Sequence, residues 1–339
     1  MRMLIAGGAG FIGSNFVHHV LQQRPDYGVL VVDKLTYAGN LNNLNAAFTH
    51  PRFSFLRLDI CAPVINDVVR GCDLVVNFAA ESHVDRSIDN AKDFVRSNIE
   101  GSWRLLEACR RAGTRRFVQV STDEVYGSLG PSGSFRENTP LSPNSPYSAT
   151  KAAADLMVQA YVKTYGFPAI VTRCSNNYGP LQFPEKFIPL MIMQALAGDF
   201  LPVYGDGQNV RDWIYVADHC CALDLVLHKG REGEIYNVGG ECEMQNIEVA
   251  RGILRLFDLP ETMIRMVKDR PGHDRRYAVD CSKLKQELGW RPMWQFWRGL
   301  EATVRWYRDN RAWLEHVRSG QYLEYFDRHY NRREAAIGN

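Results

Sequence analysis

Two side chains that lie four positions apart, Tyr147 and Lys151, are the leading candidates for chemistry in this sequence. A spacing of four brings both to one face of a helix. A phenol has a pKa near ~10, and lowering it by roughly three units takes ~4 kcal/mol. One ammonium at about 4 Å, in an effective dielectric near 20, supplies that much. Tyr147 would then remove the proton of an alcohol whose carbon gives a hydride to an oxidised nicotinamide. The same spacing is also typical of an exposed pair that matches by chance.

Three further candidates, Thr122, Asp123 and Glu124, follow a predicted strand over residues 117–121. Ligands of open parallel sheets bind at such strand ends. Consecutive strand residues point to opposite faces, so the chain must turn here if both acids are to serve one ligand. In a dry cleft, two carboxyl groups acquire different pKa values and leave one acid and one base, as an elimination requires. A solvated loop is the alternative for two adjacent acids.

A glycine-rich turn, GGAGFIG at residues 7–13, follows the first predicted strand and opens the first helix. Such glycines let the backbone and the helix N-terminus approach a pyrophosphate. Asp33 lies 20 residues beyond Gly13, where a carboxylate would bond ribose hydroxyls and repel a 2′-phosphate. This favours NAD over NADP, and Lys34 weakens the preference without reversing it. Asp59 is a candidate for the adenine edge or, equally, for a helix cap. A purely structural turn is the alternative for the glycines.

The first half of the chain predicts the scaffold that must position these groups. Apolar, β-branched runs alternate with helix-length stretches, which is typical of parallel strands covered by helices on both faces. The predicted strands are residues 3–6, 29–33, 53–58, 73–78, 117–121 and 169–173, and the predicted helices are residues 11–23, 41–47, 62–70, 94–112 and 147–165. We therefore expect an α/β fold with a doubly wound parallel sheet of the Rossmann type.

The second half is rich in glycine and proline turns and predicts a smaller lobe that folds over a ligand. Residues 214–216 and 235–238 are strand-like and could both return to the large sheet. We expect an NAD-binding domain over residues 1–176, with returning segments near 210–240. The smaller, substrate-binding lobe over residues 177–339 is then interleaved with it.

Composition excludes several classes of protein. The 339 residues carry 40 Lys+Arg and 38 Asp+Glu, a net charge of +2, which argues against a nucleic-acid partner or a polybasic membrane patch. The apolar runs are too short to span a bilayer, and the N-terminus has no signal-peptide core. The eight cysteines show neither a CxxC pair nor metal-ligand spacing. We expect reduced thiols, no metal site and a cytoplasmic protein.

Beyond these local arguments, nearly the whole chain is similar to the extended short-chain dehydrogenase/reductases, and among them to the dTDP-glucose 4,6-dehydratases. The Thr-Asp-Glu triplet distinguishes this group, because related nucleotide-sugar epimerases and decarboxylases lack the acid pair. The matching segments are residues 7–13, 33–40 (DKLTYAGN), 77–87 (NFAAESHVDRS), 122–124 (TDE), 147–151 (YSATK), 174–180 (CSNNYGP), 183–186 (FPEK), 211–213 (RDW) and 269–276 (DRPGHDRR).

The resemblance implies a closed redox cycle on dTDP-glucose. Tyr147, helped by Thr122 and Lys151, takes the proton of the 4-hydroxyl while the C4 hydride goes to NAD⁺. Glu124 then removes the C5 proton, which the new ketone acidifies, and protonated Asp123 donates to the departing 6-hydroxyl. The hydride returns to C6 and a proton to C5, which gives dTDP-4-dehydro-6-deoxy-glucose. The enzyme implied is a lyase.

The resemblance also implies binding residues. Those facing NAD are Gly7, Gly10, Phe11, Ile12, Gly13, Asp33, Lys34, Leu35, Thr36, Asp59, Ile60, Ala79, Ala80, Ser82, Ser97, Tyr147, Lys151 and Asn177. Those facing the nucleotide sugar are Ser82, His83, Arg86, Thr122, Asn176, Glu185, Lys186, Phe187, Pro202, Tyr204, Arg211, Asn246, Arg270 and His273. Arg211 and Arg270 suit a diphosphate, because guanidinium forks fit phosphate oxygens. Their alternative is a surface pair with Asp212 or Asp269, and His83 and His273 are equally well explained as structural imidazoles.

Apolar residues on more than one face of the predicted helices over 94–112 and 147–165 suit either plain core or the paired-helix homodimer that the resemblance suggests. Two other functions stay open. A nucleotide-sugar 4-epimerase would use the same Tyr, Lys and NAD, and a non-catalytic NAD-binding scaffold or sensor would need neither acid. The residues do not decide between thymine and uracil, which differ by one methyl group.

Overall fold

The chain forms an α/β structure around a seven-stranded parallel sheet, as the sequence predicts. In the computed structural model, which describes residues 1–318, the strand order is β10-β6-β5-β4-β1-β2-β3. The strands are β1 (Arg2–Ala6), β2 (Gly28–Asp33), β3 (Phe53–Arg57), β4 (Leu74–Asn77), β5 (Arg116–Thr122), β6 (Ala169–Cys174) and β10 (Ile235–Val238). Because β1 and β4 to β6 are almost wholly buried, they occur in the sequence as continuous apolar runs rather than as an alternation.

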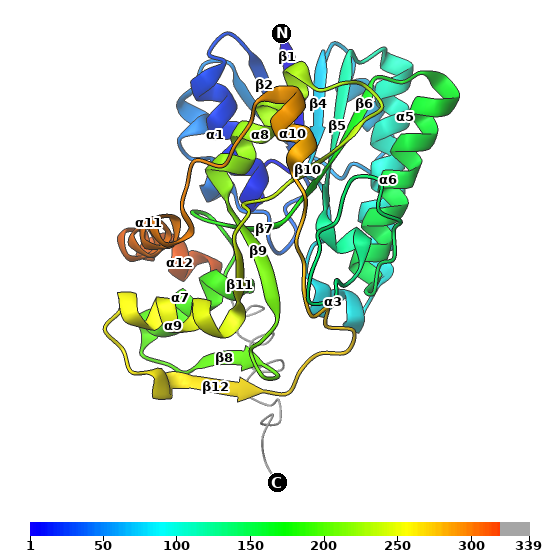
Figure 1. The fold of residues 1–339 in the computed structure, drawn as a ribbon. Coiled ribbons are helices and arrows are strands. Elements are labelled where there is room, and N and C mark those ends of the chain that lie inside the picture. Colours follow the sequence, from blue (N-terminus) through cyan, green and yellow to red (C-terminus); the bar gives the residue numbers. More distant parts are fainter. Residues whose placement is uncertain (319–339) are drawn as a thin grey trace.

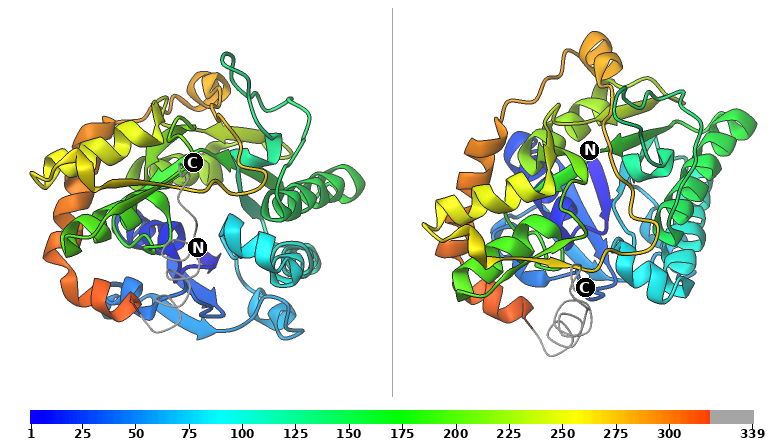
Figure 2. Two further views of the ribbon diagram at one scale, coloured as in Figure 1. Left: turned by 90° about the horizontal axis from the view of Figure 1, so that it is seen from below. Right: turned by 60° about the horizontal axis from the view of Figure 1, so that its bottom comes forward.

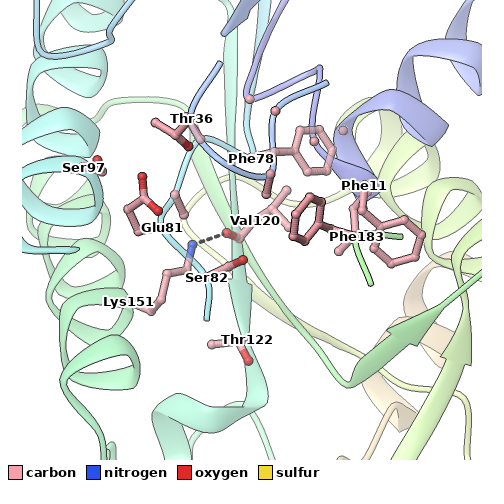
Figure 3. A pocket seen from close by; sticks show the side chains of 18 of the residues that line it. Phe11, Thr36, Phe78, Glu81, Ser82, Ser97, Val120, Thr122, Lys151 and Phe183 are labelled. Carbon is pink, nitrogen blue, oxygen red and sulfur yellow. Dashed lines mark hydrogen bonds between the residues drawn. The ribbon is translucent and has the colours of Figure 1, made fainter. Parts of the chain in front are cut away.

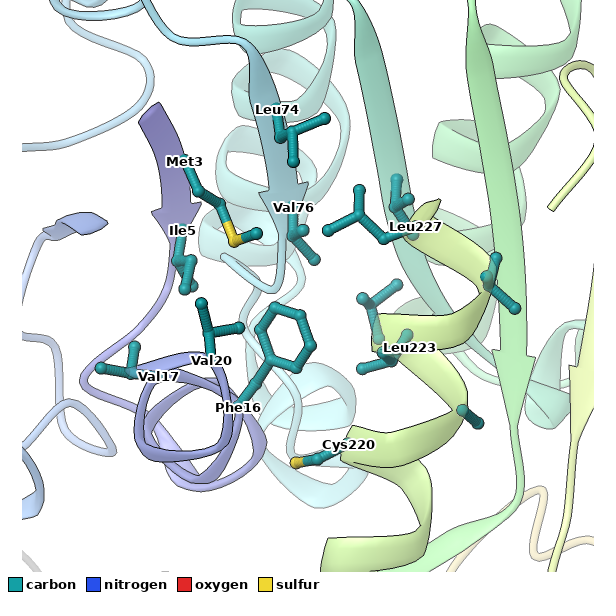
Figure 4. Close-up of a cluster of buried hydrophobic side chains, with 14 of the residues drawn as sticks. Met3, Ile5, Phe16, Val17, Val20, Leu74, Val76, Cys220, Leu223 and Leu227 are labelled. Carbon is teal, nitrogen blue, oxygen red and sulfur yellow. The ribbon is translucent and has the colours of Figure 1, made fainter. Parts of the chain in front are cut away.

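Helices cover both faces of this sheet. On one face α1 (Phe11–Gln23) packs beside α8 (Val216–Lys229), and Phe16 and Leu223 meet β-strand residues such as Ile5 in one apolar cluster (Figure 4). On the other face α5 (Ser102–Ala112) and α6 (Pro146–Tyr165) pack over the sheet in a second cluster. The short segments between strands are α2 (Ile65–Val68), α3 (Val84–Asp89), α4 (Lys92–Phe94) and the 3-10 turns η1 (Leu41–Leu44), η2 (Ala47–Thr49) and η4 (Asp123–Tyr126).

A smaller part of the molecule lies at the carboxyl ends of these strands, below the sheet in Figure 1 and on the near side in the right-hand view of Figure 2. Its apolar cluster forms around Tyr178, Trp213 and helices α7 and α9. Its elements are β7 (Asn176–Tyr178), β8 (Leu201–Tyr204), β9 (Val210–Tyr215), β11 (Glu243–Gln245), β12 (Ile264–Val267), α7 (Phe187–Ala197), α9 (Asn246–Leu256), η5 (Glu261–Met263), α11 (Phe296–Asp309) and α12 (Arg311–Val317). The strands pair as β11-β9-β7 and β12-β8.

The two parts are interleaved along the chain. After β9 the chain returns to the large sheet with α8 and β10, then re-enters the smaller part with β11. Later α10 (Ser282–Leu288) packs against β10 and α8, before α11 joins the smaller part. The domain division at residue 176 itself stays a prediction, and residues 319–339 of the predicted lobe lie outside the described residues.

Several predicted elements differ from the observed ones. Residues 214–216 do not return to the large sheet, because β9 pairs with β7 and β11 instead, whereas β10 does join β6. The helix predicted over 94–112 begins as a π-helix at Val95–Gly101 (η3) before α5. Such wide turns occur often at functional sites. The helices predicted over 41–47 and 62–70 are only short turns, η1 and α2.

No helix within residues 1–318 combines the length and the apolar character needed to cross a membrane. All eight cysteines are free thiols, and Cys221 is the exposed one. In the same described range, His, Cys, Asp and Glu side chains do not gather in groups of three or more that would hold a metal ion.

Candidate active site

The predicted acid pair lies where the chain turns at the end of β5. Thr122 ends the strand, and its hydroxyl oxygen accepts a hydrogen bond from the Glu124 N–H at 3.2 Å, which starts the 3-10 turn. The same hydroxyl donates to Asp123 Oδ1 at 3.2 Å. Asp123 is 2% exposed, and its Oδ2 is buried without a hydrogen-bond partner among residues 1–318. This turn meets the condition that both acids serve one ligand, and a solvated loop is excluded for Asp123.

The predicted Tyr and Lys enter from the first turns of α6. The helix begins at Pro146 with a capping box between Ser145 and Ser148, so its start is fixed in position. Tyr147 and Lys151 are both buried, which excludes the exposed-pair alternative. Lys151 Nζ donates to the Val120 carbonyl at 2.7 Å and ties the helix to β5 (Figure 3).

Electrostatics separates the two acids. Burial, with the charges of Glu124 and Asp212, raises the pKa of Asp123 well above its usual value. Burial also raises the pKa of Glu124, but the cations Arg270, Lys186 and Arg211 oppose that rise. This difference favours Asp123 as the group that keeps a proton and Glu124 as the base.

The phenol behaves differently from the expectation. Burial, together with Glu124, Cys174 and Asp123, raises the pKa of Tyr147 well above 10. The Lys151 ammonium, which was expected to lower that pKa, is hydrogen-bonded to a strand carbonyl, and burial lowers its own pKa. The Thr122 hydroxyl opposes this rise without reversing it, so the side chains around Tyr147 in residues 1–318 leave the phenol pKa raised.

The glycine turn forms a cradle that only glycine backbone leaves open. Gly7 has a φ of 76°, and a Cβ there would lie 2.5 Å from the Ala79 nitrogen. A Cβ on Gly13 would lie 2.3 Å from the Gly7 carbonyl oxygen. The N-cap residue of α1, Gly10, has no side chain to bond the first helical N–H groups, so these are free for an anion. This geometry fits the pyrophosphate of a dinucleotide.

Asp33 ends β2 and Asp59 lies just beyond the end of β3, both beside that turn. The Asp33 carboxylate accepts from the Ala9 N–H at 2.9 Å and from the Leu35 N–H at 2.8 Å, so it also holds the turn itself. Asp59 accepts from the Cys61 N–H at 2.9 Å, as the cap alternative requires, and pairs with Lys34 at 3.2 Å. Both acids line the adjoining cavity, and capping does not exclude a ligand contact.

All these groups surround one cavity of about 280 Å³ at the carboxyl ends of β1, β4, β5 and β6 (Figure 3). The predicted residues that line it are Gly7, Gly10, Phe11, Ile12, Gly13, Asp33, Lys34, Thr36, Asp59, Ile60, Ala79, Ala80, Ser82, Ser97, Thr122, Asp123, Glu124, Tyr147, Lys151, Asn176, Asn177, Glu185 and Lys186. Of the predicted NAD residues only Leu35 is absent from the lining. It has a φ of 59° and packs against the apolar cluster beneath.

The other predicted sugar residues lie outside this lining. They are His83, Arg86, Phe187, Pro202, Tyr204, Arg211, Asn246, Arg270 and His273. Arg211 is buried, donates to the Asp274 carbonyl at 2.9 Å and stacks over Tyr277 at 4.5 Å. The Arg270 guanidinium bonds Asp85 at 3.2 Å. Neither arginine forms the predicted alternative pair with Asp212 or Asp269 through its guanidinium.

Both histidines have protein partners. His83 Nε2 lies 3.2 Å from the Glu185 carbonyl, and burial lowers the pKa of this imidazole, so it is neutral. His273 Nδ1 lies 2.5 Å from Asp269 Oδ1, and its ring meets Tyr204 edge-on. These contacts favour the structural interpretation of His83 and leave His273 beside a predicted sugar residue.

Several lining residues were not assigned from the sequence. Glu81 and Phe78 follow β4, Ser121 belongs to β5, Ser175 follows β6, and Phe183 precedes α7. All but Phe183 lie within a few residues of a predicted strand end, so a systematic scan of strand ends would have found them.

The comparisons with known proteins agree with this geometry. Residues 4–303 match the family described as GDP-mannose 4,6 dehydratase. A dTDP-glucose 4,6-dehydratase of Xanthomonas campestris is 51% identical over 342 residues, which cover 94% of this chain and 96% of that protein. The dTDP-glucose 4,6-dehydratase of Streptomyces venezuelae, solved with NAD bound, superposes with a TM-score of 0.92 at 50% identity, over 94% of this chain and all of that one.

An epimerase of the same fold is more distant. The UDP-glucuronic acid 4-epimerase of Bacillus cereus superposes with a TM-score of 0.86 at 28% identity, over 91% of this chain and 99% of that one. Two observations decide the family. About half of all positions are identical to those of a dTDP-glucose 4,6-dehydratase, and the acid pair and the Tyr-Lys pair line one cavity. The chain belongs to the dTDP-glucose 4,6-dehydratases, within the NAD-dependent epimerases and dehydratases.

Proposed function

We propose that this protein converts dTDP-glucose into dTDP-4-dehydro-6-deoxy-glucose and water, with NAD as its cofactor. The observation that carries the proposal is one cavity lined by Tyr147, Lys151, Asp123 and Glu124. A dehydrogenase or an epimerase needs only the first two. The second two, one protonated and one with its charge favoured by nearby cations, are what a carbon–oxygen elimination adds.

The cofactor would be held by the glycine turn at its pyrophosphate and by Asp33 and Asp59 at its adenosine end. Lys34 and Thr36 line the same end of the cavity. When bound, NAD supplies a hydride acceptor that gives the hydride back later in the cycle. Its oxidised ring would also bring the positive charge that Tyr147 lacks among the described residues.

The remaining steps are proton movements by the chain's own groups. Tyr147 takes the proton of the sugar 4-hydroxyl, and Thr122, whose hydroxyl interacts with that of Tyr147, orients it. The ketone formed at C4 makes the C5 proton acidic, and Glu124 removes it. Asp123 gives its proton to the 6-hydroxyl, which leaves as water. Glu124 then returns its proton to C5, so that only water is lost.

The substrate diphosphate would be bound by Arg211, Arg270 and Lys186. All three act electrostatically on Glu124, so they surround the reacting end of the cavity. Arg211 is a buried guanidinium with no carboxylate within ion-pair distance among residues 1–318. A buried cation of that kind is stabilised when an anion binds beside it.

The decisive experiment separates oxidation from elimination. Asp123→Asn and Glu124→Gln should each slow product formation by ~10²–10⁴-fold, the contribution of one acid–base group. Both should still form NADH in a single turnover with dTDP-glucose, seen by absorbance. Asp67→Asn is the matched control and should dehydrate normally, because Asp67 is an exposed acid that forms a surface pair with Arg70.

The proposal fails if both variants dehydrate like the unmodified enzyme. A product that keeps its 6-hydroxyl, detected by NMR, would indicate a 4-epimerase instead. Undiminished biological activity of Tyr147→Phe would indicate a scaffold or sensor. Kinetics with dTDP-glucose beside UDP-glucose then decides the nucleotide base, for which one methyl group is worth ~1–3 kcal/mol.

We also infer a homodimer. Several large apolar side chains are exposed on neighbouring helices. They are Trp103 on α5, Leu156 and Tyr165 on α6, and Val95 at the start of η3. Apolar surface of this extent on two adjacent helices is typical of an interface. Light scattering should give twice the chain mass, and Leu156→Glu should give the monomer; a monomeric unmodified protein would refute the inference.

Two further expectations complete the proposal. A cytoplasmic location is supported by eight free thiols, which a reducing compartment maintains, and cell fractionation tests it. A division into an NAD-binding domain over residues 1–176, with returning segments near 210–240, and an interleaved lobe mainly over 177–339 is supported by the apolar clusters. Two of them lie on the faces of the large sheet and take in the returning segments, and a third lies in the smaller part. Limited proteolysis with and without dTDP tests the division.

A further inference from the structure

The N-terminal turn of α3 carries a buried acid that the proposed mechanism does not use. Asp85 is 4% exposed and lies shortly after residues 79–82, which line the cavity. Its two carboxylate oxygens accept from two different side chains. Arg270 Nη1 donates to Oδ1 at 3.2 Å, and the Tyr204 hydroxyl donates to Oδ2 at 2.9 Å.

Both donors belong to the smaller part of the molecule. Tyr204 ends β8, and Arg270 follows β12, the strand that pairs with β8. Tyr204 is itself paired in register with Val267, three residues before Arg270. Figure 1 shows α3 at the lower end of the large sheet, beside the segment that leaves β12. The single carboxylate of Asp85 therefore bridges the cofactor side of the cavity to the end of the two-stranded sheet.

The neighbours of Asp85 on α3 make the same junction. Arg86 Nε donates to Glu185 Oε2 at 3.0 Å, and His83 contacts the Glu185 carbonyl. Glu185 and the adjacent Lys186 line the cavity. One turn of α3 thus fixes three separate segments of the substrate side, around residues 185, 204 and 270.

The charge on Asp85 is maintained in this setting. Burial alone would raise the pKa of the carboxyl, but the Arg270 charge and the hydrogen bonds from Tyr204 and Arg270 bring it well below its usual range. Asp85 is therefore ionised wherever the enzyme works, and it offers Arg270 a charge-assisted bond of the strong kind.

The bond to Asp85 uses one nitrogen of the Arg270 guanidinium and leaves its other N–H donors for a ligand. Its Nη1 is used by Asp85, while its Nε is buried without a hydrogen-bond partner among the described residues. Asp269 accepts from the backbone N–H of Arg270 rather than from its guanidinium, and its Oδ1 also contacts His273 Nδ1. The guanidinium also acts electrostatically on Glu124, which lines the cavity. A planar fork held by a carboxylate at one nitrogen presents its other donors in a fixed direction.

We infer that Asp85 is a positioning residue, which aims the Arg270 guanidinium at the substrate diphosphate and couples the cofactor side of the cavity to the nucleotide site. The inference rests on the proposed function for its substrate. An arginine side chain has many rotamers, and fixing them before binding removes that entropy loss from the binding step. Loss of Asp85 would free Arg270 and would also leave Tyr204 without an acceptor for this bond.

The test is Asp85→Asn in the full chain, with dTDP binding measured by calorimetry beside steady-state kinetics on dTDP-glucose. Breaking a buried charge pair weakens binding by about 30-fold or more, so we expect that change in the Kd for dTDP and in KM. We expect kcat to stay within about threefold and NAD affinity to be unchanged. Asp206→Asn is the matched control, because Asp206 pairs with Arg275 in the same region but both side chains are more than half exposed.

A double-mutant cycle shows whether Asp85 acts through Arg270. In an Arg270→Gln background, Asp85→Asn should weaken dTDP binding by less than about threefold, since the group that it positions is gone. Unchanged dTDP affinity in Asp85→Asn, or full additivity of the two changes, would overturn the inference. If Asp85→Asn does not fold, Asp85→Glu, which displaces the carboxylate but keeps its charge, should weaken dTDP binding, and unchanged affinity there has the same meaning.

This outcome is separate from failure of the proposed function. An unmodified enzyme that does not dehydrate dTDP-glucose refutes the proposed function. An unmodified enzyme that does, together with an unaffected Asp85→Asn variant, refutes only the role of Asp85.

Discussion

Asp155 and Arg173 form the most deeply buried ion pair found in residues 1–318, and breaking it should destabilise the fold strongly. Their side chains are 0% and 1% exposed, and Arg173 Nε donates to Asp155 Oδ2 at 2.9 Å. Asp155 lies four residues after Lys151 on α6, and Arg173 belongs to β6. The pair therefore joins the helix that carries Tyr147 and Lys151 to the strand beneath it.

The size of the effect follows from this burial. Asp155→Asn keeps the shape but leaves the Arg173 charge uncompensated, which costs ~3–5 kcal/mol in a dry interior. An unfolding entropy of about 2.1 cal/mol/K per residue, over 339 residues, gives roughly 0.7 kcal/mol/K. The expected fall in Tm is thus about 4–7 °C. Asp155→Asn with Arg173→Gln removes both charges and should recover most of this loss.

Thermal unfolding followed by circular dichroism measures these changes, at constant pH and without ligand. Glu261→Gln is the control, because Glu261 pairs with Arg251 on the surface, where both side chains are 45–60% exposed. Exposed pairs contribute about 0–1 kcal/mol, so its Tm should shift by less than ~1.5 °C. A fall below about 1 °C for Asp155→Asn, or losses that simply add in the double variant, would refute the reasoning.

Three other changes have definite expected outcomes. Gly13→Ala places a Cβ 2.3 Å from a backbone carbonyl of the same turn and should weaken NAD binding by about 10- to 100-fold in a fluorescence titration, whereas Gly130→Ala, where the space is open, should not. Lys151→Met should lower kcat by ~10²-fold or more and yet raise Tm, because it replaces a buried ammonium by an apolar chain; a lower Tm contradicts this. Burial lowers the pKa of His19, but Asp224, whose Oδ2 lies 3.8 Å from His19 Nε2, and Cys221 together outweigh this and raise that pKa to about 9. The charged imidazole therefore stabilises the fold fully below pH 6.5 and loses this effect as pH rises through about 9, so His19→Gln should destabilise at pH 6 and not at pH 10, as urea unfolding at both values will show.

The strands of the large sheet could be predicted because a strand that is buried on both faces has a continuous apolar sequence, as β1 and β4 do. The apolar sequence of a strand does not indicate which other strand it pairs with. Residues of β9 look like those of β10, but Tyr215 and Trp213 pack with Tyr178, and that tertiary contact draws β9 into a different sheet. The π-helix before α5 was invisible for a similar reason, since a wider turn leaves no pattern in composition.

The candidate site likewise has features that local sequence predicts and features that depend on tertiary contacts. Tyr147, Lys151, Asp123 and Glu124 were found from local spacing, because each pair lies within one turn of chain. The local argument expected Lys151, with the added charge of an oxidised nicotinamide, to lower the pKa of Tyr147. It did not count burial or the two acids, which raise that pKa in the structure.

Asp85 was not assigned at all. Its hydrogen-bond partners, Tyr204 and Arg270, are 119 and 185 residues away in the sequence, and no local pattern around Asp85 predicts these contacts.

The alternation of the chain between its two parts has a consequence for engineering. Because α8, β10 and α10 belong with the large sheet while the segments between them do not, a single junction cannot exchange one part for that of a relative. A chimera with one crossover would sever strands from their neighbours. New sugar or base preferences in this scaffold must therefore be reached by point substitution or by grafting several short segments together, rather than by swapping modules.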